Sequence, residues 1–241
     1  MNSYKLLALR LDEFPNGFPA TEDGAELRLL EKLFTPEEAE LTSKLRMTFE
    51  THQQIAERIG GNADELRLVL KSMTKRGLIK AGKTEDGLGF GLMPFVVGIY
   101  EYQVGHMDAE LATLFEDYYQ RAFAQVLGIN PQVHRVVPVN QTIQTDMEIA
   151  PYENVSAIID GAKSWGVVDC ICRQQKALIG DPCEHPLDVC MTLSAHPGAF
   201  DHNKTIRALT QEEAMETLAL LQEIADIDEE LGIEESSENK T

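Results

Sequence analysis

The sequence lacks any run of apolar residues long enough to span a bilayer. Its first residues, MNSYKLLALRLDEF, contain acidic side chains early and lack the long apolar centre of a signal peptide. We therefore expect a cytoplasmic protein without membrane insertion. Thiols stay reduced in that compartment, so disulfides are the least favoured use of its cysteines.

Positive charge is scarce. The chain has 21 Lys and Arg residues against 40 Asp and Glu residues, a net charge of −19. Such a chain repels nucleic acid and anionic membranes unless it carries a separate basic patch. Residues 226–241 hold seven acids against Lys240 alone, which predicts a solvated acidic tail. The charge suits a protein partner with a basic docking face.

The sequence also lacks a recognisable set of catalytic groups. No phosphate-binding loop occurs, because the glycines of GLGFG at 87–91 fall in a predicted hairpin. No Ser, His and Asp arrangement follows from spacing. We therefore expect a non-catalytic protein or subunit rather than a stand-alone enzyme.

What is present predicts a helix-rich α+β protein. Capping signals start helices at Thr35, Thr51 and Asn62, and Gly77 ends the last of these. Two strands with an Asp–Gly turn follow within 78–93. Helix, tight turn, helix and hairpin is the order of a winged helix-turn-helix, which predicts a winged-helix-like domain over residues 1–94. Helices are also predicted at 1–13, 26–34 and 35–45.

Winged helices bind DNA or proteins, and charge distinguishes the two uses. From residue 35 to residue 90 the sequence has nine Lys or Arg against nine Asp or Glu. A DNA-binding domain usually shows a clear basic excess, so nucleic acid is not the expected partner. The predicted recognition helix, DELRLVLKSMTKR, carries Arg67, Lys71, Lys75 and Arg76 beside Asp64 and Glu65.

A long connecting helix is predicted over 98–128, within a linking region of residues 95–130. It either bridges the two halves or forms a homodimer contact, and both remain open. His106 is expected at the surface or in that contact. The aromatic residues of this region indicate packing rather than a cofactor pocket: Tyr100, Phe115, Tyr118, Tyr119 and Phe123.

The second half predicts a small α+β module over residues 131–225, with the boundary at GINPQ. A helix is expected after Pro151, followed by the buried strand WGVVDC. Thr210 and Glu213 form a capping box for a final helix. Further strands are predicted at 135–139 and 142–150.

All four cysteines of the chain lie within residues 165–191: Cys170, Cys172, Cys183 and Cys190. Zinc knots use two closely spaced pairs of ligands. Here the second pair is too widely spaced, and neither His185 nor His196 compensates, although zinc remains open. An iron–sulfur cluster tolerates a wider loop. Arg173 and Lys176 either offset the charge of a cluster or are simply solvated.

The run VVDCICRQQKALIGDPCEHPLDVCM, together with MPFVVGIYE at 93–101, resembles a family of 4Fe-4S binding, ferredoxin-like proteins, mostly from anaerobic bacteria and archaea. The resemblance covers roughly residues 1–220 and includes a winged-helix-type start. It implies one [4Fe–4S] cluster held by Cys170, Cys172, Cys183 and Cys190. It also implies electron transfer with a redox protein partner or a larger oxidoreductase complex. Unlike this chain, such proteins usually continue into a second cysteine-rich stretch and a ferredoxin module.

Two other functions remain open. One is a metal- or redox-responsive transcription regulator that uses the winged helix on DNA and the cysteines as a sensor. The other is an accessory subunit in which the metal, zinc included, is purely structural.

Overall fold

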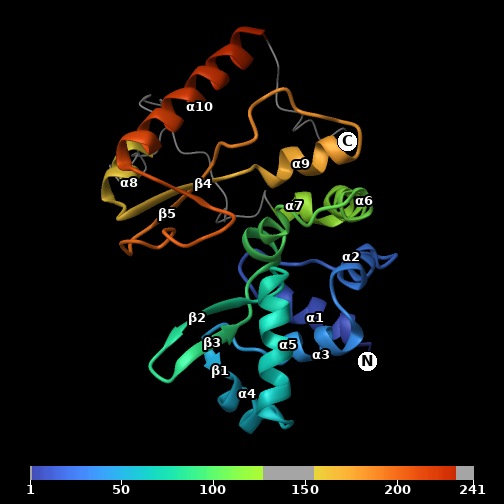
Figure 1. Cartoon of the computed structure of the whole chain (residues 1–241). Coiled ribbons are helices and arrows are strands. Elements are labelled where there is room, and N and C mark those ends of the chain that lie inside the picture. Colours follow the sequence, from blue (N-terminus) through green and yellow to red (C-terminus); the bar gives the residue numbers. More distant parts are fainter. Residues whose placement is uncertain (1, 127–154, 232–241) are drawn as a thin grey trace, which may run out of the picture. The chain divides into compact units, whose positions relative to one another are not determined.

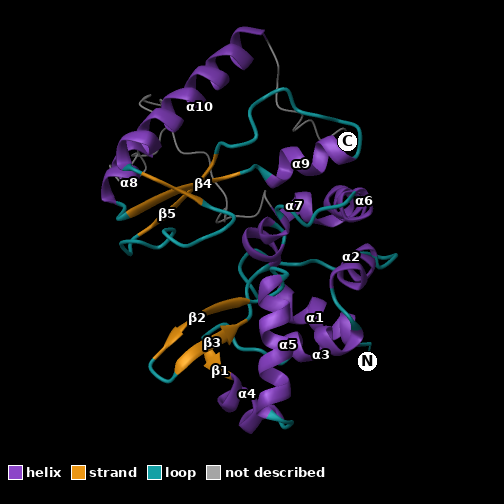
Figure 2. Cartoon of the chain, in the orientation of Figure 1, coloured by secondary structure: helices purple, strands orange, loops and turns teal. Residues whose placement is uncertain are grey.

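The computed structural model describes residues 2–126 and 155–231. The chain divides into two compact units. Unit 1 comprises Met1–His134 and Gln174–Pro182, and unit 2 comprises Arg135–Arg173 and Cys183–Thr241. Each unit combines helices with a three-stranded antiparallel sheet, which confirms the predicted helix-rich α+β class (Figure 2).

Unit 1 opens with short helices and continues into a helical pair and a small sheet (Figure 1). Its regular elements are α1 (Ser3–Asp12), α2 (Ala25–Leu33), α3 (Pro36–Ser43), β1 (Glu50–Thr51), α4 (His52–Ile59), α5 (Ala63–Lys75), β2 (Lys80–Thr84), β3 (Gly87–Gly91), α6 (Ala109–Tyr118) and α7 (Ala124–Val126).

The predicted helix starts are confirmed at atomic detail. Thr51 Oγ1 accepts the Gln54 backbone N–H at 3.3 Å, while the Gln54 side chain accepts the Thr51 N–H at 2.8 Å. The same reciprocal pair forms between Thr35 and Glu38. These bonds satisfy backbone donors that have no partner inside the helix.

The predicted hairpin forms between β2 and β3, with Thr84 opposite Gly87 next to the turn. A strand that was not predicted, β1, pairs with β3, so the sheet order is β1-β3-β2. The Phe49 ring lies over the sheet. A methyl group on Gly82 or Gly89 would lie within 3 Å of the Phe49 side chain, so the close approach of the ring requires glycine.

The prediction of one continuous helix over 98–128 is wrong in its first third. Gly98 has non-helical backbone angles (φ 169°, ψ −109°), Glu101–Gln103 forms only a short 3-10 helix, and Gly105 has a left-handed φ of +79°. The helix starts only at α6, where the Asp108 side chain accepts the Leu111 N–H at 2.7 Å. Asp108 is thus the N-cap of this helix, which begins at Ala109 rather than at residue 98.

The aromatic residues of this region pack, as predicted. Tyr100 and Phe115 stack with ring centroids 3.8 Å apart. Tyr118 is fully buried beside Phe18, and its hydroxyl donates to the Pro19 carbonyl at 3.1 Å. Offset and tilted ring pairs of this kind stabilise a core beyond their buried area.

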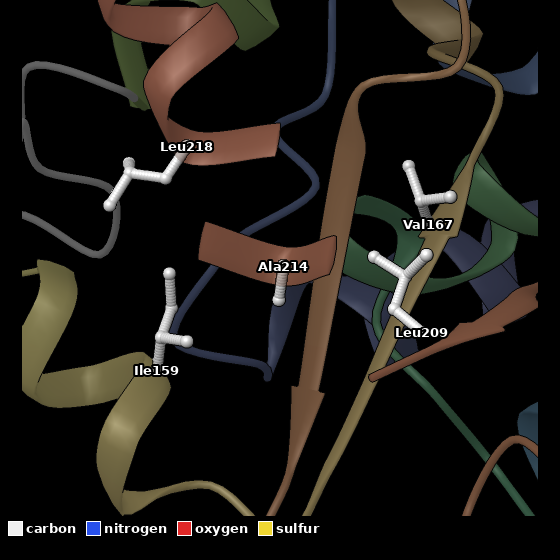
Figure 3. Close-up of a cluster of buried hydrophobic side chains, with 5 residues drawn as sticks. All are labelled: Ile159, Val167, Leu209, Ala214 and Leu218. Carbon is white, nitrogen blue, oxygen red and sulfur yellow. The ribbon is translucent and has the colours of Figure 1, made fainter. Parts of the chain in front are cut away.

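Unit 2 packs two helices on its sheet, whose order is β5-β4-β6. Figure 3 shows the core between α8, α10 and the strands, formed by Ile159, Val167, Leu209, Ala214 and Leu218. The elements of this part of the chain are α8 (Val155–Gly161), β4 (Ser164–Val168), α9 (Ile171–Leu178), β5 (Cys190–Ser194), β6 (Arg207–Leu209) and α10 (Gln211–Leu231). Of α9, only Ile171–Arg173 belongs to unit 2.

Several boundaries in the second half differ from the prediction. Residues 174–182 belong to unit 1 rather than to the predicted 131–225 module. The last helix, started by the confirmed Thr210–Glu213 capping box, reaches Leu231, so the first part of the predicted 226–241 tail is helical. The strands predicted at 135–139 and 142–150 lie outside the described residues. Among the helices that are described, none has the length and apolar composition needed to cross a membrane.

Candidate metal site

The four cysteines lie at the ends of three consecutive elements, β4, α9 and β5. Cys170 follows β4, and Cys172 is in the first turn of α9. Cys183 lies in the loop after α9, and Cys190 is the first residue of β5. All four belong to unit 2, and no two of these described cysteines form a disulfide.

Strand pairing places two of the thiol positions close together. Val168, the last residue of β4, lies opposite Cys190 in the antiparallel ladder. Cys170 comes two residues later, so Cys170 and Cys190 lie at the same end of two adjacent strands. The sheet therefore brings together residues that are twenty positions apart in the sequence.

The second half of the loop is bonded back to the start of α9. The Cys170 backbone N–H donates to the Leu187 carbonyl at 2.7 Å. The Arg173 guanidinium donates to the Pro186 carbonyl. Val189 is buried just before β5. These contacts hold the segment that carries Cys183 and Cys190 against the turn that carries Cys170 and Cys172.

The Cys170 thiol has a lowered pKa. A hydrogen bond from Cys172 is the largest cause, and it lowers the pKa of Cys170 from 9.0 to about 6. Partial burial opposes the shift, while backbone N–H groups of Arg173 and Cys172 and the charge of Arg173 favour it. The lowered pKa favours the thiolate, the form that binds metals.

Cys183 is exposed but has a close polar neighbour. Its Sγ lies 3.1 Å from Nδ1 of His185, within hydrogen-bonding distance for sulfur. His185 was not predicted as a site residue, because it and His196 are too far apart to form a closely spaced pair of ligands. The Cys-x-His spacing was the signal that could have identified it.

The two cations of the loop have different roles. Arg173 bonds to the loop backbone at Pro186. Lys176 is not simply solvated: within unit 1 its ammonium lies 3.0 Å from Glu116, to which buried Gln175 also donates at 3.0 Å. These bonds explain why residues 174–182 pack with α6.

The structure pairs Cys170 with Cys172 but does not gather all four predicted ligands. Within residues 2–126 and 155–231, no three His, Cys, Asp or Glu side chains are arranged to hold a metal ion. The chemistry of the donors nevertheless fits a thiophilic centre, since thiolate is the ligand that iron–sulfur clusters and soft metals prefer.

Comparisons of the chain with models of protein families, with curated proteins and with solved structures found no match.

Proposed function

We propose that this chain is a cytoplasmic iron–sulfur protein that binds one [4Fe–4S] cluster through Cys170, Cys172, Cys183 and Cys190. The observation that carries the proposal is the bonded loop: all the thiols of the chain lie in unit 2, on segments that Leu187 and Pro186 join to the start of α9. Cluster ligands come from such loops, which wrap the inorganic core.

When bound, a cluster of this kind takes up and releases single electrons. The cysteines of the chain would hold it. The lowered pKa of Cys170 would favour the thiolate form of this ligand. Arg173 fixes the loop backbone and leaves a positive charge next to the thiolates. Cys172, Cys183 and Cys190 are exposed, so a protein partner can approach the centre closely.

The partner we propose is another redox protein or a larger oxidoreductase complex. With a net charge of −19, the chain would be steered toward a partner with a basic face. The proposal assigns no substrate and no catalytic residue to the chain.

Anaerobic reconstitution tests this function. The chain is incubated with iron and sulfide, desalted and analysed for metal, sulfide and visible absorbance. We expect about four irons and four sulfides per chain and a broad band that dithionite bleaches. Single Cys→Ser variants at positions 170, 172, 183 and 190 should lose it, while Thr192→Ser on β5 keeps it. Stoichiometric zinc without colour would instead support the structural-metal alternative.

A second candidate function, DNA binding by unit 1, is favoured by one observation. The order α3, β1, α4, α5, β2, β3 matches that of a winged helix. On α5, Arg67, Lys71 and Lys75 are exposed at successive i, i+4 positions, and the described residues show no ion pair to any of them. Unpaired cations on one helix face suit phosphate contacts.

Two features of the same helix weigh against DNA. Its first turn carries Asp64 and Glu65, and Leu68 is 70% exposed on its surface. A gel shift with random duplex DNA at low salt tests whether unit 1 binds DNA. Tight, salt-sensitive binding that is lost in the Arg67→Ala/Lys71→Ala/Lys75→Ala variant would establish the DNA-binding alternative. Absence of binding in the wild-type chain would remove it.

A further inference from the structure

His185 lies next to one of the predicted ligands of the candidate site. Its Nδ1 lies 3.1 Å from Cys183 Sγ. The neighbouring residues Pro186 and Leu187 are bonded to Arg173 and Cys170. The imidazole therefore lies next to an anchored part of the loop, between Cys183 and Cys190 in the sequence.

We propose that His185 is a positioning residue of the metal site, one that donates an Nδ1–H hydrogen bond to Cys183 and orients this ligand. The inference rests on the proposed function. It concerns the second layer of the site, because the thiol remains the ligand and the imidazole acts on it. Outer-layer donors of this kind orient metal ligands and tune the metal that they hold.

The physical case rests on an asymmetry between two of the thiols. Cys170 receives backbone N–H groups of Cys172 and Arg173, since it precedes the first turn of α9. Cys183 is exposed and lies in a loop without a helix start to supply such donors. His185 gives Cys183 the donor that the backbone gives Cys170. A hydrogen bond to a ligating sulfur withdraws charge from it and favours the reduced state of a cluster.

Cobalt binding to the metal-free chain under reducing, anaerobic conditions tests the proposal. Co²⁺ reports thiolate ligation by its absorbance, and competition with a chromophoric chelator gives the dissociation constant. His185→Ala should weaken binding by about 10- to 100-fold, the usual effect of losing an outer-layer partner. His185→Asn, whose amide nitrogen occupies the place of Nδ1, should restore most of the affinity. His202→Ala, an exposed histidine of the same unit, is the matched control and should bind as wild type does.

The outcomes distinguish failure of the role of His185 from failure of the proposed metal-binding function. Cobalt binding that is equal in His185→Ala and His202→Ala overturns the role of His185 and leaves the proposed function standing. An equal loss in His185→Ala and His185→Asn indicates direct coordination by the imidazole and also overturns the hydrogen-bonding role. A wild-type chain that binds neither cobalt nor a cluster overturns both proposals.

A second readout uses the reconstituted cluster. In His185→Ala the midpoint potential should shift to a more negative value, with His185→Asn lying between this variant and wild type. His202→Ala should keep the wild-type potential. A potential unchanged in His185→Ala contradicts the inference, whatever the iron content shows.

Discussion

Replacing Gly166 with alanine tests how closely unit 2 is packed around the strand that leads to Cys170. Gly166 is in β4, the central strand of the sheet. A Cβ atom at this position would lie 2.5 Å from Cγ2 of Ile206 and 3.1 Å from the Phe200 ring. Carbon atoms pack at about 3.5–4.0 Å, so Ile206 would have to move by about 1 Å.

The expected cost follows from two opposing contributions. Overpacking a core costs about 1–3 kcal/mol. The φ of Gly166 is outside the left-handed region, so alanine also lowers the entropy of the unfolded chain, a gain of about 0.4–1 kcal/mol. The net loss is roughly 1–2 kcal/mol. If the free energy of unfolding falls by about 2 kcal/mol per molar urea, the urea concentration at the midpoint of unfolding should fall by about 0.5–1 M.

The single tryptophan provides the assay. Trp165 lies in unit 2, and its indole N–H donates to the Ile159 carbonyl at 2.8 Å, so its fluorescence reports the unfolding of this unit. Gly161→Ala is the matched control, because nothing lies within 4 Å of an added Cβ there. It should leave stability unchanged or raise it slightly.

A double variant identifies the clash. Ile206→Ala removes the atom closest to the new methyl group, so Gly166→Ala should cost less in that background. If Gly166→Ala were as stable as wild type, or if Gly161→Ala lost as much, the packing described around β4 would be wrong.

Three further predictions concern local features. Thr51→Ala removes the cap of α4 and should lower the unfolding free energy in urea by about 1 kcal/mol, whereas Thr51→Ser should not. Burial raises the pKa of Glu116, but hydrogen bonds from Gln120, Lys176 and Gln175 outweigh burial and hold this pKa below 4.5. The free energy of unfolding should therefore decline as the pH falls below 4.5, and it should decline less steeply in the Glu116→Gln variant. In the metal-free chain, thiolate absorbance that Cys170→Ser abolishes should titrate near pH 6; titration only above pH 8 would contradict the lowered pKa of Cys170.

The local elements of this protein were predictable because their causes are local. Thr35, Thr51 and Thr210 start helices through bonds to residues three positions along, and such signals are legible in the sequence. The hairpin of 80–91 likewise follows from an Asp–Gly turn between short strands. The clustering of the four cysteines was also evident, because it is a matter of spacing.

The break before α6 could have been predicted in part from the sequence. Asp108 is a recognisable N-cap, yet the apolar periodicity of the segment outweighed it in the prediction of one long helix. Burial of the aromatic residues was predicted correctly from the same periodicity. Their ring-to-ring contacts with Phe18 and Phe95 depend on the tertiary fold.

The sequence by itself determined the helix starts, the hairpin, the α+β class and the set of four thiols, since each depends on residues close together in the chain. Only the tertiary structure decided that Gln175 and Lys176 pack on Glu116, and that Cys170 bonds to the backbone of Leu187. It also decided that His185 meets Cys183, although the two residues are close in sequence, because loop geometry depends on where the anchored neighbours hold the backbone. Contacts of this kind are set by packing and by the satisfaction of buried polar groups, which residue spacing does not encode.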